Sequence, residues 1–239
     1  MAGHSKWKTI KHKKAALDAK RGKAFTKLIK EITVVARDGG GDPDANPRLR
    51  TLMDKAKHIN MPSDNVMRAI KKGTGELPGQ SYEAVTYEGY GPGGIAILVD
   101  ALTDNKNRTV ADLRHQFSKK GGNLAETGAV SWMFEKKGAL TMKAPDMSED
   151  ELLEILIDYD VSDIRKDEGM FVIYCEPKEL DIVKKALEAH SGIIVESAEL
   201  DWVAKNPMDL DEAQSTKALE LLEVLDDHDD VQNVYTNLA

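Results

Sequence analysis

The hydrophobic pattern changes its period near residue 80, and this change limits the possible folds more than any other feature of the chain. From residue 23 to residue 73, apolar residues recur every three or four positions, which indicates amphipathic helices. Beyond residue 82 the apolar runs are short and separated by turn-forming residues, which indicates strands alternating with helices. The stretch GTGELPGQ at 73–80 predicts a linker. We therefore expect a helical domain followed by α+β structure.

Three helices are predicted before the linker. The first spans 23–37 and ends at the glycine-rich loop DGGGDPDANP. Asn46 is suited to the N-cap of the second helix and Pro47 to its first position, since proline needs no partner there for a backbone N–H. The second helix runs to about residue 60, and Pro62-Ser63 opens a third that ends near Gly73.

The order of elements after the linker indicates one domain inserted into another. The expected elements are strand 82–87, a turn at 89–94, strand 95–102, helix 107–120, strand 129–134, strand 138–143, helix 148–158, strand 161–166, strand 169–175, helix 178–190, strand 193–203, helix 211–225 and strand 230–236. From residue 138 to residue 203 this order is βαββαβ, the ferredoxin-like arrangement. The preceding unit lacks a helix and a strand, which the C-terminal elements can supply.

The predicted fold class is therefore α+β, with an N-terminal helical domain followed by two ferredoxin-like α+β domains, one inserted in the other. Its parts are a flexible basic arm at 1–22, a three-helix domain at 23–79, an α+β domain at 80–135 plus 205–239, and an inserted α+β domain at 136–204.

The charge is distributed unevenly along the chain. The net charge is −8, yet residues 1–72 hold 18 Lys and Arg against 7 Asp and Glu, whereas the remainder holds 15 against 34. Such asymmetry indicates a polyanion-binding end. Lysines and arginines that neutralise phosphates release counterions, and a tryptophan among them can stack on an exposed base. The alternative is a solubilising tail without a partner.

The residues predicted to contact nucleic acid lie in the arm and on the polar face of the first helix. They are Lys6, Trp7, Lys8, Lys11, His12, Lys13, Lys14, Lys20, Arg21, Lys23, Lys27 and Lys30. A secondary contact site is possible at Asn105, Lys106, Asn107 and Arg108, because they precede a helix whose first backbone N–H groups can receive an anion. A helix cap at Asn107 is the favoured interpretation of this stretch. The acidic run DDHDD at 226–230 is interpreted as a solvated turn.

Signatures of enzymes, cofactors and membrane spans are poor. The six histidines show no HExxH or paired metal-ligand spacing, and no GxSxG elbow is present. The single cysteine, Cys175, is predicted to be a buried strand residue. Because one cysteine cannot form a disulfide within the chain, the sequence favours a reducing compartment such as the cytoplasm. No apolar run approaches the roughly 20 residues of a membrane span. We expect no catalytic residue, cofactor, metal or small-molecule substrate; a nuclease metal site at Glu88, Asp100 and Asp104 is a distant alternative.

Several long strings closely resemble the YebC/PmpR family. They are MAGHSKW, KRGKAFTKLIKEI, GGGDPDANPRLR, YEGYGPGG, DNKNRTVADLRHQFSKKGGNL and SWMFEKKG. The resemblance is dense from residue 1 to about residue 138 and looser beyond. It implies a three-domain fold with two α+β domains arranged around a cleft, and no catalytic residue or cofactor. It also implies a cytoplasmic, DNA-binding transcriptional regulator, although related mitochondrial proteins are described as translational activators and bacterial members have been linked to the ribosome.

Two functions therefore remain open, both of them non-enzymatic. A DNA-binding regulator of transcription needs phosphate contacts and an element that reads base edges, and no convincing base-reading helix is evident. An RNA- or ribosome-associated translation factor anchored by the basic arm is the alternative, because a lysine-rich arm with one aromatic residue suits irregular RNA.

Overall fold

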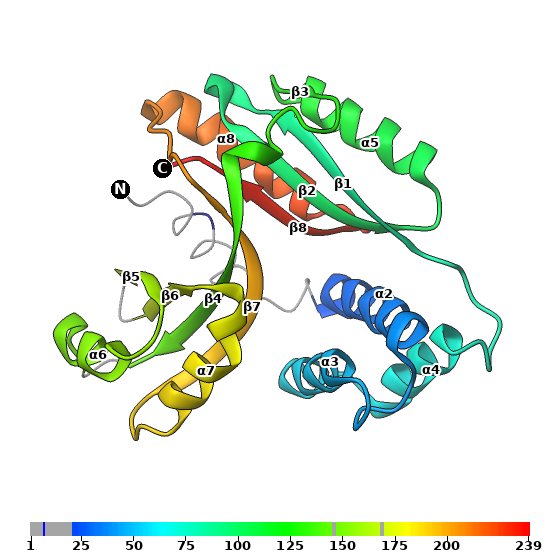
Figure 1. The fold of residues 1–239 in the computed structure, drawn as a ribbon. Coiled ribbons are helices and arrows are strands. Elements are labelled where there is room, and N and C mark those ends of the chain that lie inside the picture. The colour runs from blue at the N-terminus through cyan, green and yellow to red at the C-terminus, as the bar shows by residue number, and fades with distance from the viewer. Residues whose placement is uncertain (1–6, 8–20, 145–146, 168–169) are drawn as a thin grey trace. The chain divides into compact units, whose positions relative to one another are not determined.

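The computed structural model describes residue 7 and residues 21–144, 147–167 and 170–239 (Figure 1). The chain forms two compact units. One unit contains Trp7 and the described residues of 132–209 and 235–239, and the other contains residues 21–131 together with residues 210–234. None of the described helices is both long enough and apolar enough to cross a membrane.

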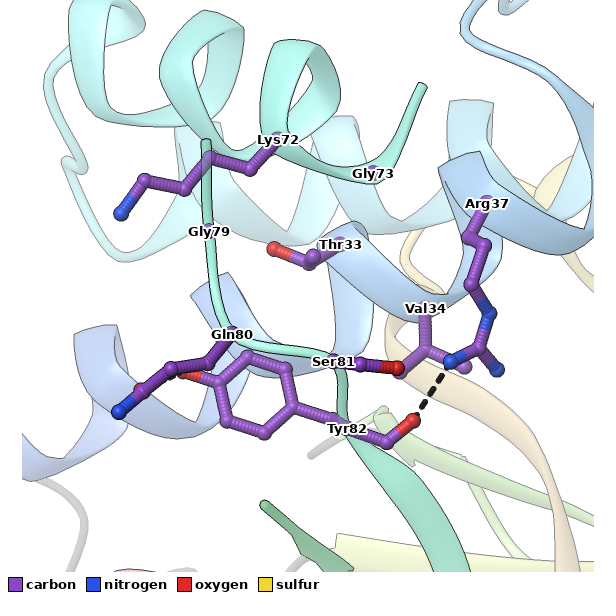
Figure 2. A pocket seen from close by; sticks show the side chains of 9 residues that line it. All are labelled: Thr33, Val34, Arg37, Lys72, Gly73, Gly79, Gln80, Ser81 and Tyr82. Carbon is purple, nitrogen blue, oxygen red and sulfur yellow. Dashed lines mark hydrogen bonds between the residues drawn. The ribbon is translucent and has the colours of Figure 1, made fainter. Parts of the chain in front are cut away.

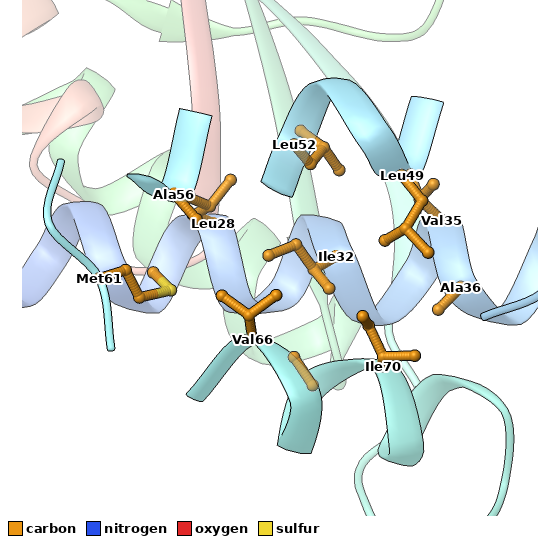
Figure 3. Packing of buried hydrophobic residues seen from close by; sticks show 11 residues of the cluster. Leu28, Ile32, Val35, Ala36, Leu49, Leu52, Ala56, Met61, Val66 and Ile70 are labelled. Atoms are coloured by element: carbon orange, nitrogen blue, oxygen red, sulfur yellow. The ribbon is translucent and has the colours of Figure 1, made fainter. Parts of the chain in front are cut away.

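The helical domain consists of α2 (Arg21–Gly39), α3 (Pro47–His58) and α4 (Ser63–Gly73), which confirms the three predicted helices. Figure 3 shows their apolar faces packed together, with Ile32 of α2 between the side chains of α3 and α4. The fully or nearly buried residues of this core are Leu28, Ile32, Val35, Ala36, Leu49, Leu52, Ala56, Met61, Val66, Ala69 and Ile70. The close approach of α4 to α2 requires a glycine, since a Cβ at Gly73 would lie 2.4 Å from the carbonyl oxygen of Thr33.

Asn46 caps α3 and also ties it to α2. Its Oδ1 accepts a hydrogen bond from the backbone N–H of Leu49 at 3.1 Å, as predicted for an N-cap. Its Nδ2 donates to the carbonyl oxygens of Val35 and Gly40, at 3.1 and 2.9 Å. One buried amide therefore satisfies backbone groups at the end of one helix and the start of the next.

Replacing Asn46 by alanine should lower the free energy of unfolding by about 2 kcal/mol, because the cap and two bonds to carbonyl oxygens are lost together. Urea denaturation followed by circular dichroism measures the change. Asn46→Asp separates the two roles, since aspartate can cap the helix but cannot donate to the carbonyls. Asn46→Asp should also destabilise; wild-type stability in that variant would show that the two Nδ2 bonds contribute nothing.

A four-stranded sheet in the order β3-β1-β2-β8 follows the helical domain in the chain. Strands β1 (Glu83–Tyr90) and β2 (Ala96–Thr103) pair antiparallel across the short helix η2 (Pro92–Gly94). Helix α5 (Lys106–Lys119) and strand β3 (Asn123–Leu124) come next. Helix α8 (Glu212–Asp226), which packs against α5, and strand β8 (Val231–Thr236) come from the C-terminal end of the chain. The sheet is therefore built from two separate stretches of sequence.

The predicted strand 129–134 is wrong. Instead, residues Ser131–Met133 form the 3₁₀ helix η3, and the edge of the sheet is the two-residue β3. The cause is Glu88, whose carboxylate accepts hydrogen bonds from the N–H groups of Gly128, Val130 and Ser131. These donors are consequently not available to a strand ladder.

The second sheet has the order β5-β6-β4-β7 and is antiparallel throughout. Its elements are β4 (Phe134–Lys143), α6 (Glu149–Leu156), β5 (Val161–Asp167), β6 (Met170–Cys175), the short helix η4 (Pro177–Glu179), α7 (Leu180–Glu188) and β7 (Ile194–Ala204). This is the predicted βαββαβ order of a ferredoxin-like domain. Cys175 is buried in β6, as expected, and burial together with Glu179 and Glu176 raises the pKa of its thiol to about 11.

Candidate nucleic-acid interface

Most of the predicted arm residues lie outside the part of the chain that the structure describes. They are Lys6, Lys8, Lys11, His12, Lys13, Lys14 and Lys20, and for Arg21 only the backbone is described, at the first position of α2. Trp7 is described, and its side chain is only 4% exposed. The hypothesis that Trp7 offers an exposed platform for a base therefore does not match this structure.

The lysines on the polar face of α2 contact the C-terminal end of α8. Lys23 Nζ donates to the carbonyl oxygen of Asp227 at 2.9 Å, and Lys27 Nζ donates to that of Asp226 at 2.6 Å. The last carbonyls of a helix have no partner within the helix, and the negative end of the helix dipole favours cations. Lys23 and Lys27 thus stabilise the end of α8 rather than facing solvent alone.

Lys30 is even less available to a nucleic acid. It is 8% exposed, and its Nζ lies 2.6 Å from Oδ1 of Asp230 and 2.9 Å from the carbonyl oxygen of Asp229. A phosphate could reach Lys30 only by displacing a buried ion pair. The structure thus gives Lys30 a role within the chain, and the segment 226–230, interpreted as a solvated turn, binds the lysines of α2.

Asp230 is the centre of a buried polar cluster. Besides Lys30, its carboxylate accepts hydrogen bonds from the Arg108 guanidinium at 2.8 Å and from the Thr109 hydroxyl at 2.7 Å. Burial by itself would raise the pKa of Asp230, but the hydrogen bonds from Lys30, Arg108 and Thr109 outweigh it and hold the pKa well below its usual range. The cluster links α2, α5 and the start of β8.

The secondary contact site is largely occupied by contacts within the chain. Asn105, rather than Asn107, caps α5, since its Oδ1 accepts from the backbone N–H of Arg108 at 3.1 Å. Lys106 pairs with Glu83 at 2.5 Å, and Arg108 pairs with Asp104 as well as Asp230. Asn107 is exposed. These contacts hold the start of α5, and a secondary nucleic-acid contact at this stretch stays a prediction.

A group of three exposed cations lies on α4. This helix buries Val66, Ala69 and Ile70, while Arg68, Lys71 and Lys72 are exposed and, within the described residues, have no ion pair or side-chain hydrogen bond. Positions 68, 71 and 72 are spaced by three and four, so they share one face of the helix. That spacing, in the run RAIKK, is the signal by which sequence reasoning could have selected this surface.

The acids considered for a nuclease metal are engaged elsewhere. Glu88 binds three backbone N–H groups, Asp100 accepts from the Thr86 hydroxyl at 2.7 Å, and Asp104 accepts from Arg108. Among the described residues, no three His, Cys, Asp or Glu side chains are grouped as metal ligands would be.

Both parts of the chain match models of one family. Residues 5–76 match the TACO1/YebC protein N-terminal domain, and residues 82–238 match the TACO1/YebC second and third domain. A probable transcriptional regulatory protein of Desulfotalea psychrophila is 56% identical over 238 residues, which cover 99% of this chain and 95% of that protein. One from Chlorobaculum tepidum is 53% identical over 239 residues, with 100% and 95% covered.

A solved structure is similar over nearly the whole chain as well. The crystal structure of a conserved hypothetical protein, Aq1575 from Aquifex aeolicus, has a TM-score of 0.86 and 47% sequence identity, and the match covers 94% of this chain and 93% of that one. The order of elements, the two sheets and both domain matches agree with one another. The chain therefore belongs to the TACO1/YebC family.

Proposed function

We propose that this protein is a non-enzymatic regulator of transcription in the cytoplasm and that it binds DNA through the cationic face of α4, which consists of Arg68, Lys71 and Lys72. The observation that carries the proposal is the exposure of these three cations without ion pairs in the described structure. Relatives that are more than half identical over the whole chain are named probable transcriptional regulatory proteins. The basic arm at 1–22 is proposed as a second contact, because its lysines add sequence-independent affinity.

The proposed contact is electrostatic. Arginine and lysine side chains on one helix face can bind phosphate oxygens along a duplex backbone, which fixes position without reading sequence. Lys23, Lys27 and Lys30 do not add to this surface, because the acidic segment at 226–230 and the end of α8 already bind them. Selection among DNA sites would then depend on groove shape and deformability rather than on a dedicated base-reading helix.

Removing charge from α4 should weaken DNA binding more than removing the same charge elsewhere. The double variant Arg68→Gln/Lys71→Gln should lower affinity roughly tenfold near 0.15 M salt and reduce the salt slope by about 0.9 for each lost phosphate contact. The matched control is Arg114→Gln/Lys119→Gln on α5, which removes two exposed cations that likewise lack ion pairs among the described residues. Fluorescence anisotropy with labelled duplex DNA at several salt concentrations measures both quantities.

Equal losses in the two double variants would contradict α4 as the interface. A site-specific regulator should also prefer its own DNA site over random duplex by at least about 10³. Structured RNA is the comparison probe: tighter binding to RNA than to any duplex DNA at matched salt would overturn the assignment to transcription.

A further inference from the structure

A small hollow lies where α2, the end of α4 and the segment 79–82 meet. Figure 2 shows Thr33 and Val34 of α2 at its centre, with the chain from Gly79 to Tyr82 passing alongside. The aliphatic part of the Lys72 side chain lies over Gly79. A Cβ added at Gly79 would be 3.2 Å from three carbons of Lys72. The volume of the hollow is about 110 Å³.

Two cationic side chains line the hollow, and one of them, Arg37, is paired with Asp38. Arg37 and Lys72 line it from opposite flanks, and no carboxylate belongs to its described lining (Figure 2). Arg37 is held in place because its Nη1 donates to the carbonyl oxygen of Tyr82 at 2.6 Å and its Nε donates to Asp38 at 2.9 Å. Its Nη2 has no hydrogen-bond partner among the described residues. The guanidinium is therefore oriented in advance and still has donors to offer.

Neutral donors complete the lining. The hydroxyl of Ser81 makes no hydrogen bond to any residue that the structure describes, and it can donate or accept. The Tyr82 hydroxyl donates to Oε1 of Gln80 at 3.2 Å, which fixes the amide and leaves its NH₂ group to donate. Two cations, a hydroxyl and an amide are the groups with which proteins bind the oxygens of a phosphate.

The size of the hollow is sufficient for one such group. At about 110 Å³ it is somewhat smaller than an apolar cavity of about 150 Å³ that binds one benzene molecule. One tetrahedral phosphate, which has five heavy atoms, fits in such a space.

We propose that this hollow binds a single phosphate group and that Arg37 and Lys72 hold it, the phosphate being one from a nucleic-acid backbone. The assignment of the backbone as the source rests on the proposed function above. Lys72 belongs both to the cationic face of α4 and to the hollow. One strand of nucleic acid can therefore place one phosphate in the hollow while its neighbouring phosphates contact Arg68 and Lys71. The link between the helical domain and β1 thereby becomes part of the interface.

Inorganic phosphate tests the hollow without any nucleic acid. In ¹H–¹⁵N spectra of the ¹⁵N-labelled chain, titration with phosphate at constant ionic strength should shift the backbone amides of Gly79, Gln80 and Ser81 in a saturable way. Lys72→Gln should abolish the shift, whereas Lys119→Gln should leave it unchanged. Chloride at the same ionic strength should have no effect; equal shifts with chloride, or none with phosphate, would overturn the proposal.

A duplex oligonucleotide then identifies the source of the phosphate. The same amides should shift at lower concentrations of oligonucleotide than of inorganic phosphate, and Lys72→Gln should reduce the salt slope by about 0.9. If inorganic phosphate shifts these amides while the wild-type chain binds no nucleic acid, the phosphate site stands and the proposed function fails. If nucleic acid binds through Arg68 and Lys71 without moving these amides, the proposed function stands and the phosphate site is overturned.

Discussion

Replacing Asp230 by alanine should lower the free energy of unfolding by about 3–5 kcal/mol, the range measured when one partner of a buried ion pair is removed. The carboxylate is 3% exposed and accepts hydrogen bonds from Lys30, Arg108 and Thr109. Without it, the Lys30 ammonium stays buried and keeps, among the described residues, only neutral partners: the carbonyl oxygen of Asp229 and the Tyr82 ring, whose centroid is 5.5 Å away. Urea denaturation followed by far-ultraviolet circular dichroism measures the loss.

The chain provides a matched control one position earlier. Asp229 carries the same side chain, but that side chain is exposed, and Lys30 binds only its backbone carbonyl. Asp229→Ala should therefore change the free energy of unfolding by less than about 0.5 kcal/mol, as is usual for surface substitutions. Similar losses in the two variants would show that the acidic segment acts through its overall charge and not through the buried cluster.

The lowered pKa of Asp230 also predicts how the stability difference between wild type and Asp230→Asn depends on pH. In the unfolded chain an aspartate titrates near pH 3.9, whereas in the folded chain the hydrogen bonds keep Asp230 ionised to lower pH despite its burial. A depressed folded-state pKa contributes stability that is fully present above the unfolded pKa and is lost as the pH falls towards the folded one. The stability difference between wild type and Asp230→Asn should therefore be constant from about pH 8 to pH 5 and shrink below about pH 4.

Local pattern was sufficient to predict most of the fold. The apolar spacing of α2, α3 and α4, the cap at Asn46 and the βαββαβ order from β4 to β7 all depend on residues close together in sequence. The failed strand at 129–134 has the β-branched and aromatic residues typical of a strand, among them Val130 and Phe134. A side chain 40 to 43 residues earlier, Glu88, takes up its N–H groups, and no local pattern contains that information.

The candidate site was harder to predict for the same reason. A lysine face opposite an apolar face looks identical whether it meets solvent or another helix, and the partners of Lys23, Lys27 and Lys30 lie 199 to 204 residues away in the sequence. Acidic residues at 226–230 and lysines on α2 neutralise each other, so counting charge in each segment overestimates what is available to a ligand. The α4 face was not selected because helix periodicity does not gather all the lysines and arginines between residues 48 and 72 on one side, although no ion pair within the described structure neutralises Arg68, Lys71 and Lys72.

Glu88→Ala should destabilise the chain by about 3–5 kcal/mol, comparably to the loss of Asp230. Its carboxylate is 4% exposed and accepts from the N–H groups of Gly128 and Val130 at 2.7 Å and of Ser131 at 2.8 Å. Leaving a buried donor without a partner costs about 1–3 kcal/mol, and this applies fully to Val130 and in part to the half-buried Ser131, whereas the exposed Gly128 can donate to water. Burial acts to raise the pKa of Glu88, but the three backbone bonds outweigh it and lower the pKa, so its contribution also declines as the pH falls into the acidic range.

Two further variants separate the role of the carboxylate from that of side-chain volume. Glu88→Gln keeps the size and one acceptor oxygen but turns an NH₂ group towards backbone donors, so it should lose somewhat less stability than Glu88→Ala. Glu126→Ala, an exposed glutamate next to the same turn, should be neutral within about 0.5 kcal/mol. Hydrogen exchange locates the effect, because the amides of Val130 and Ser131 should lose protection in both Glu88 variants before the amides of β1 and β2 do. If those two amides stay protected while global stability falls, Glu88 acts on the sheet as a whole, and the account of why residues 129–134 form no strand is wrong.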